Sequence, residues 1–369
     1  MLCRSIRGLI LGLALISVAN ADLTEGLKQG DIKLTSVGPL AFGPDGVLFV
    51  SDPLAAKIYA VDTADRSGDA DKASYDLKNL GGQIAAALGT TPRGVRVIDV
   101  VVNPASGNVF MSVMRGSGPE SAAVLLRVNP AGDLAIVELT GVKHSHAQLP
   151  NAPANREVQR RGRKSNRRTQ SITDLAFVDG RVIVAGLSNE EFASNLRSIP
   201  FPFQQVDKGT SVEIYHGAHG AFETRSPVRT FAAYKIAGAS YLLAGYTCTP
   251  LVKFPIADLK PGSKVKGTTI AELGNRNRPL DMVVYSDKGK DYILIANNAR
   301  GIMKVTTENI DKIAGITKRV GGGGTAGLKY ETIKSLKGVT QLDRLNESMA
   351  LVLVQGEDGQ ENLQSVALP

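Results

Sequence analysis

Five side chains of this sequence are of the types that bind transition metals, and four of them come in two close pairs. The five are His144 and His146 in an H-S-H segment, His216 and His219 in an H-G-A-H segment, and Cys248. Imidazole nitrogen and thiolate sulfur suit borderline or soft ions such as copper or zinc. Gly217 and Gly220 place the second pair in a turn rather than on a helix. We therefore expect a copper or zinc site here, the alternative being ordinary loop residues.

A second set of side chains carries oxygen ligands for a hard cation. Asp99, Asp174 and Asp281 each directly precede an apolar strand-like segment. The loops around these segments add the amides Asn189, Asn297 and Asn298. Carboxylate and amide oxygens suit Ca²⁺, which can polarise an ester or lactone carbonyl. In the alternative interpretation, each aspartate only accepts hydrogen bonds from backbone amides of its own turn.

These residues are scattered along the chain, and an internal repeat is what can gather them. Each copy has an apolar strand, a turn, a second apolar strand and a small polar cluster. The six copies are Pro39–Asp52, Ile98–Met114, Thr173–Asn189, Phe231–Cys248, Leu280–Asn298 and Thr340–Gly356. Third and fourth apolar segments follow most copies, and the absence of Trp with 39 Gly favours short strands and turns over helices.

Four antiparallel strands repeated radially describe an all-β fold, the β-propeller, which leaves only short sheet edges. Six copies predict six blades, with seven as the alternative. The last copy has only three strands before the chain stops, so we expect the N-terminal segment Asp31–Thr35 to supply its fourth strand. The loops that enter the inner strands then share one face with the loops between second and third strands. This rule predicts a ligand site at the mouth of the central channel.

The copies resemble the six-bladed propellers of the NHL, SMP-30/gluconolactonase and sorbosone/glucose dehydrogenase types. The resemblance covers most of the chain as a pattern of strands and turns, and the gluconolactonase type implies a Ca²⁺ ion at the aspartates. The stretch G-N-R-N-R-P-L-D, residues 274–281, resembles a segment of the dehydrogenases that contacts pyrroloquinoline quinone. It would assign Arg276 and Asn277 to the quinone, with Arg278 beside them, but Asp281 stands where that family keeps Gly.

The termini and the charge indicate where the protein works. Arg4 and Arg7, an apolar run and Ala19-Asn20-Ala21 form a secretory signal, so we expect cleavage after Ala21 and a periplasmic or extracellular domain over residues 22–369.

Residues 151–170 carry seven Lys or Arg against Glu157, and with the signal they account for the whole net charge of +8. The neutral remainder excludes a basic nucleic-acid-binding domain, and 151–170 is expected to be a flexible basic insertion. Its residues 156–168 are candidates for contact with an anionic surface.

The sequence thus predicts an exported propeller with a small-molecule site at the channel mouth, assisted by a metal in hydrolytic or redox chemistry. Two alternatives stay open. The same face can bind an exported protein or a glycan without catalysis, or the chain can be a quinone-dependent dehydrogenase of sugars or aldehydes.

Overall fold

The computed structural model describes residues 23–160, 162–248 and 250–369. The expected signal peptide and its cleavage site after Ala21 lie outside these residues. Within them, no helix is both long and apolar enough to cross a membrane.

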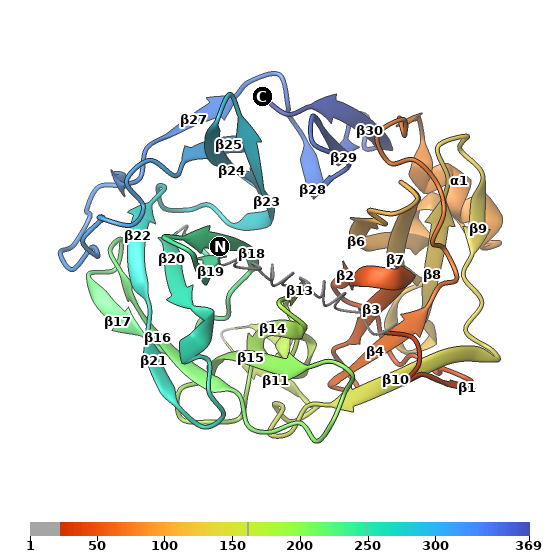
Figure 1. The fold of residues 1–369 in the computed structure, drawn as a ribbon, viewed down its shortest axis with the longest axis horizontal. Coiled ribbons are helices and arrows are strands. Elements are labelled where there is room, and N and C mark those ends of the chain that lie inside the picture. Colours follow the sequence, from red (N-terminus) through yellow and green to blue (C-terminus); the bar gives the residue numbers. More distant parts are fainter. Residues whose placement is uncertain (1–22, 161, 249) are drawn as a thin grey trace, which may run out of the picture.

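Six mainly antiparallel sheets stand around a central axis, so the chain is a six-bladed β-propeller (Figure 1). We number the blades one to six in chain order of their inner strands. These strands are β2 (Leu40–Phe42), β6 (Val95–Val102), β13 (Asp174–Val178), β18 (Thr230–Ile236), β23 (Pro279–Asp287) and β28 (Val339–Arg344). Each overlaps one of the six repeat copies, which confirms the expected fold class with six blades rather than seven.

The remaining strands complete each blade from the inside outwards. The second strands are β3 (Val47–Asp52), β7 (Val109–Arg115), β14 (Arg181–Leu187), β19 (Ala239–Gly245), β24 (Lys290–Asn297) and β29 (Met349–Gln355). The third strands are β4 (Lys57–Asp62), β8 (Ala122–Val128), β15 (Ser194–Pro200), β20 (Pro250–Pro255), β25 (Ile302–Thr306) and β30 (Glu361–Ala367). The fourth strands are β10 (Val142–Gln148), β9 (Leu134–Ile136), β16 (Thr210–His216), β22 (Thr268–Glu272), β27 (Tyr330–Ile333) and β5 (Asp76–Leu77).

The second strands form the most buried layer because each is covered by neighbouring blades on both faces. Every residue of β3 is buried, which explains why these strands read as continuous apolar runs rather than alternating ones. Two-residue turns lead into several of them. Asp179 and Gly180 have φ of 48° and 74°, and Lys288 and Gly289 have φ of 49° and 75°. Positive φ at both residues is the turn geometry whose twist matches a right-handed hairpin, and glycine favours it.

The blades do not follow the chain order around the ring. Blade two lies between blades six and one, and blade one lies between blades two and three, as the ring in Figure 1 shows. The apolar cores between blades agree, because Val100 of blade two packs with Leu351 of blade six, and Phe49 of blade one packs with Val184 of blade three. The chain returns after blade two to add β10 to the outer edge of blade one. A repeat pattern alone contains no signal for this exchange.

The exchange also decides how the ring is closed, and here the expectation was wrong. The fourth strand of blade six is β5, which pairs with β30 through Leu77 and Leu363. Asp31–Thr35 forms no strand, and its neighbour β1 (Lys28–Gly30) pairs with β10 of blade one instead. The chain passes blade six on its way from blade one to blade two, so β5 reaches that edge first.

The other elements lie outside the four-stranded blades. Helix α1 (Leu80–Ala87) covers the core between blades two and six. Short strands β17 (Ala221–Glu223), β21 (Lys264–Lys266) and β26 (Ala326–Gly327) extend blades three and four. The 3₁₀ helices are η1 (Pro44–Gly46), η2 (Pro92–Gly94), η3 (Gly118–Glu120), η4 (Arg167–Gln170) and η5 (Ile256–Asp258).

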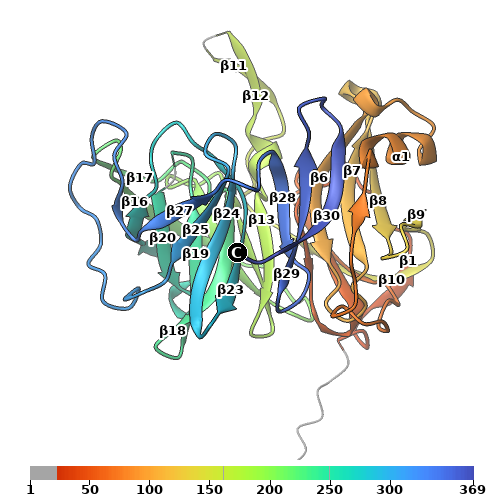
Figure 2. The same cartoon turned by 90° about the horizontal axis from the view of Figure 1, so that it is seen from above.

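The basic insertion has a secondary structure that its composition did not indicate. Strands β11 (Glu157–Arg160) and β12 (Arg163–Asn166) form a hairpin that projects from one face of the ring (Figure 2). Its exposed charged side chains fit the predicted solvated segment, but the backbone is a paired ladder rather than an irregular loop.

Candidate functional site

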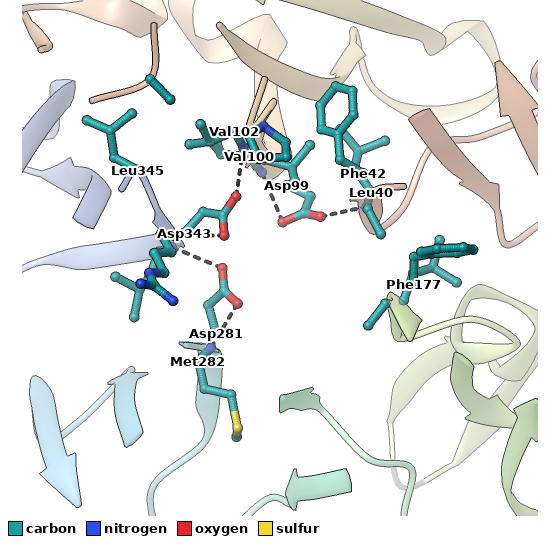
Figure 3. A pocket seen from close by; sticks show the side chains of 18 of the residues that line it. Leu40, Phe42, Asp99, Val100, Val102, Phe177, Asp281, Met282, Asp343 and Leu345 are labelled. Atoms are coloured by element: carbon teal, nitrogen blue, oxygen red, sulfur yellow. Dashed lines mark hydrogen bonds between the residues drawn. The ribbon is translucent and has the colours of Figure 1, made fainter. Parts of the chain in front are cut away.

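Two cavities meet at the centre of the propeller. One, of about 590 Å³, opens on the face of the basic hairpin, because Thr169 and Gln170 at the base of that hairpin line it. We call it the arginine chamber. The other, of about 540 Å³, is the second chamber, seen in Figure 3. Asp99, Asp174 and Asp281 line both, so these aspartates form the waist between the chambers.

The structure confirms that the three aspartates converge, and it adds a fourth. Asp343 of β28 lines the second chamber beside Asp99 and Asp281 (Figure 3). The equivalent position of the sixth repeat copy, directly before its apolar segment, holds Gln341. Gln341 instead donates from Nε2 to the carbonyl of Ile98 at 2.9 Å, and the acidic residue comes two positions later. This shift within the repeat is why sequence reasoning missed Asp343.

Each of these four carboxylates accepts two backbone hydrogen bonds. Oδ1 accepts the N–H of the following residue at 2.7–2.9 Å. Oδ2 accepts an N–H from the inner strand of a neighbouring blade at 2.6–3.0 Å. The inter-blade donors are Leu40 for Asp99, Phe231 for Asp174, Leu342 for Asp281 and Val102 for Asp343. The aspartates therefore hold the inner strands of neighbouring blades together. This agrees with the alternative interpretation, in which the carboxylates accept backbone hydrogen bonds, and adds donors from the neighbouring blade to those of their own turn.

The buried position of the four aspartates disfavours the charged form of their carboxyl groups. Burial raises the pKa of Asp174 to about 7 and that of Asp343 to about 6, although backbone donors oppose the shift. Burial also raises the pKa of Asp99 and Asp281 well above the usual range, with neighbouring carboxylates adding to it. Among the described residues, the four aspartates do not form a group of three with ligand atoms close enough for one ion. The expected Ca²⁺ site therefore gains no support from the geometry.

Three arginines face the other side of the waist. Arg96 of β6, Arg229 before β18 and Arg278 before β23 all line the arginine chamber. Within the described chain, none of the three forms an ion pair with a carboxylate. The side chain of Arg229 donates from Nε to Oγ1 of Thr247 at 3.2 Å. Burial lowers the pKa of Arg229, and the charge of Arg278 lowers it further. The chamber thus gathers three cationic side chains, none of which forms an ion pair within the described part of the chain.

The amide residues that were expected to bind a ligand either hydrogen-bond within the protein or lie away from the two chambers. Asn277 is 2% exposed, and its Nδ2 donates to Oδ1 of Asn297 at 3.1 Å. Asn298 accepts the N–H of Arg278 through Oδ1 at 2.7 Å. Asn189 is exposed, and the residues that line the two chambers do not include it.

The positions of these residues also show whether pyrroloquinoline quinone could bind as the resemblance implies. Its expected partner Asn277 is buried against other side chains, and Arg276 lines neither chamber. Of the stretch 274–281, only Arg278, Leu280 and Asp281 reach the arginine chamber. The residues present therefore do not fit pyrroloquinoline quinone in the expected way.

The structure divides the predicted metal ligands into two places. His144 and His146 lie in β10, the outer strand of blade one, rather than in a connection between blades. Their rings lie 6.4 and 5.8 Å from the ring of Tyr59, measured between centroids. Burial lowers the pKa of His146. These two histidines are therefore separate from the other three residues.

His216, His219 and Cys248 do come together, where the outer strand of blade three meets the loop between the second and third strands of blade four. Each offers a ligand atom, and the three atoms lie within 4.8 Å of one another. His216 ends β16, and a four-residue turn to β17 returns His219 to the same side, with the two ring centroids 3.9 Å apart. A cavity of about 430 Å³ opens over all three residues.

Two glutamates that sequence reasoning missed complete this cluster. Glu223 bridges the rings, with Oε1 2.5 Å from Nδ1 of His219 and Oε2 3.1 Å from Nδ1 of His216. Although burial raises the pKa of Glu223, the interactions with the two histidines bring it down to about 2. Glu272 is buried and accepts the N–H of Gly217 through Oε1. Neither glutamate belongs to a recognisable motif, because folding alone brings them to the histidines.

Comparison with known proteins finds distant likenesses of structure. No family model matches the chain, and no curated protein matches it. A protein of Thermus thermophilus assigned as a glucose dehydrogenase is similar, at 13% identity and a TM-score of 0.35, over 92% of this chain and 100% of that one. The aldose sugar dehydrogenase of Streptomyces coelicolor, in its PQQ-bound form, is similar at 10% identity and a TM-score of 0.32, over 92% and 96%. An engineered GH43 glycoside hydrolase is similar at 10% and 0.35, over 73% and 49%.

Proposed function

We propose that this protein binds a small anionic molecule, carrying a carboxylate or a phosphate, in the arginine chamber. The observation that carries the proposal is the convergence of Arg96, Arg229 and Arg278 on one cavity from three different blades. Arginine presents a planar fork of donors that matches carboxylate and phosphate oxygens. A cavity of about 590 Å³ is also large enough for a small metabolite.

The electrostatics of the chamber favour an anion over a neutral ligand. The carboxylates at the waist accept backbone hydrogen bonds, and burial raises their pKa values, which weakens their ability to neutralise the arginines. Arg229 and Arg278 repel one another. A bound anion relieves this repulsion and gains charge-assisted hydrogen bonds, each of which contributes roughly 1.5–3 kcal/mol.

The test is a binding measurement by calorimetry with a panel of carboxylates, phosphates and sulfates, and their neutral amide or alcohol analogues. We expect binding of at least one anion and none of its neutral analogue. Arg278→Gln should weaken binding by about 10-fold or more, since one charge-assisted hydrogen bond is lost. Arg127→Gln, an exposed arginine outside the chamber, is the control. Equal binding of charged and neutral analogues would refute the proposal.

A metal-assisted hydrolytic or redox reaction on the bound molecule is the second candidate function. It is favoured by the position of the His216 cluster, because Thr247 both accepts the hydrogen bond from Arg229 and lines the cluster cavity next to Cys248. The two cavities therefore adjoin on one face of the propeller. Turnover of lactones, esters and sugar acids, measured with and without added Zn²⁺ or Cu²⁺, tests it. His219→Gln should abolish turnover while the affinity of the chamber stays unchanged, and metal-independent turnover would contradict it.

A further inference from the structure

We propose that His216, His219 and Cys248 are the ligands of a borderline divalent metal ion, Zn²⁺ or Cu²⁺, and that Glu223 orients the two imidazoles for it. Their ligand atoms lie within 4.8 Å of one another. Around a tetrahedral ion, metal–nitrogen distances of about 2.0–2.1 Å and a metal–sulfur distance of about 2.3 Å place such atoms roughly 3.3–3.6 Å apart. His219 is exposed and can rotate, so small side-chain movements close the difference.

A second observation at the same place is a buried ring without hydrogen bonds. His216 is 2% exposed, and neither of its ring nitrogens makes a hydrogen bond within the described part of the chain. Glu223 lies 3.1 Å from its Nδ1, close enough for an ion pair but outside hydrogen-bond geometry. Buried polar atoms are almost always satisfied in folded proteins. A metal ion bound to Nε2 would satisfy that nitrogen, for which the described chain offers no hydrogen-bond partner, while Nδ1 faces Glu223.

Glu223 holds the two histidines in the form that a metal needs. Its two oxygens face Nδ1 of His216 and Nδ1 of His219. Nδ1 of His219 already hydrogen-bonds this carboxylate, and a small movement would let Nδ1 of His216 do the same. Nδ1–H donation from both rings would leave Nε2 of each as a free lone pair, which is the arrangement that carboxylates commonly impose on metal-binding histidines. The bridge also explains why two rings can pack with centroids 3.9 Å apart.

Cys248 is held at the cluster by its backbone. Its φ is +64°, a conformation that costs a non-glycine residue energy, and its N–H donates to the carbonyl of Asn277 at 2.7 Å. Metal binding would release the thiol proton to solvent and form a metal–sulfur bond. The thiolate and Glu223 balance the charge of a divalent ion, and the buried Glu272 beside Gly217 adds a further carboxyl group.

The metal would keep an open position. The cluster faces a cavity of about 430 Å³ that is also lined by Phe222, Arg225 and Ser226. Three protein ligands with a fourth position open to solvent are typical of catalytic rather than structural zinc sites. The site therefore has room for a water molecule or for a ligand that reaches it from solvent.

The test is a titration of the untagged full-length protein, stripped with a chelator, first with Co²⁺ and then with Zn²⁺. We expect one equivalent of Co²⁺ to produce a thiolate-to-cobalt charge-transfer band, and Zn²⁺ to remove it. Cys248→Ser should abolish the band, and His219→Gln should weaken binding at least 10-fold. Glu223→Gln should weaken it about 10–100-fold while the band remains, as expected for a residue that orients a ligand.

His146→Gln is the matched control, because this exposed histidine lies in β10 outside the cluster. Thermal unfolding of each variant verifies its fold, and the exposed position of His219 makes that substitution the safest of the three. The proposal fails if saturating Co²⁺ gives no band, if the band persists in Cys248→Ser, or if His146→Gln weakens binding as much as His219→Gln. Because the assay contains no organic ligand, its outcome is independent of anion binding in the arginine chamber.

Discussion

Oδ2 of Asp174 in β13 accepts the backbone N–H of Phe231 in β18 at 2.6 Å, across the boundary between blades three and four. The other oxygen of the same carboxylate accepts the N–H of Leu175 at 2.8 Å. Blade four has Thr230 where blade three has the aspartate, so one carboxylate serves two blades. The carboxylates of Asp99 and Asp281 serve blades one and six in the same way.

This relationship predicts an unusual pH dependence of stability. The pKa of Asp174 in the folded chain is about 7, above its ordinary value of 3.8. Between these pH values the folded state holds a proton that the unfolded state releases, so stability falls as the pH rises towards 7. Urea unfolding at pH 5 and pH 8 should show a larger loss of the free energy of unfolding in the wild type than in Asp174→Asn. An equal loss in both would contradict the assignment.

Removal of one chamber arginine should stabilise the protein without ligand. Arg278→Gln removes the charge that repels Arg229, and we expect a gain of about 0.2–1 kcal/mol in the free energy of unfolding at low salt. The gain should disappear near 1 M salt, where the screening length is about 3 Å. Urea unfolding at both salt concentrations measures it, and a gain that persists at high salt would have another origin.

The hydroxyl of Tyr75 should help to fix the segment that closes the ring. Tyr75 directly precedes β5, is 3% exposed, and donates from its hydroxyl to the carbonyl of Gly107 at 2.6 Å. Tyr75→Phe leaves this carbonyl without its donor and should cost about 1–2 kcal/mol of unfolding free energy. Tyr75→Ala should cost about 3–5 kcal/mol, because it also empties the core between blades two and six. Tyr215→Phe, at a half-buried tyrosine of β16, should change stability little, and an equal effect there would refute the role of Tyr75.

The basic hairpin should contribute to binding rather than to folding. Replacement of residues 157–166 by Gly-Gly removes exposed side chains and a ladder that pairs only with itself, so we expect a change of at most about 0.5 kcal/mol in stability. Affinity for an anionic polysaccharide should fall, and the salt dependence of that affinity should weaken. Fluorescence binding at several salt concentrations measures both. Unchanged polysaccharide affinity would leave the hairpin without this role.

The local features of this protein follow from its sequence. Six apolar strand pairs separated by turns, such as Asp179-Gly180, determine the blades, because apolar patterning and turn chemistry act over a few residues. The same local logic placed Asp99, Asp174 and Asp281 at the channel, since equivalent repeat positions must lie at equivalent points of a ring. The H-G-A-H turn likewise fixes His216 beside His219.

The tertiary structure decided everything that depends on which blade neighbours which. The repeat could not place blade two beside blade six, because every blade presents similar apolar faces to its neighbours. That placement made β5 rather than Asp31–Thr35 the closing strand, and it put His144 and His146 into the edge of blade one. It also joined Asp343 to Val102 across 241 positions of sequence. Glu223 reached the two histidines within one blade, through a hairpin pairing whose register is fixed only when the sheet forms.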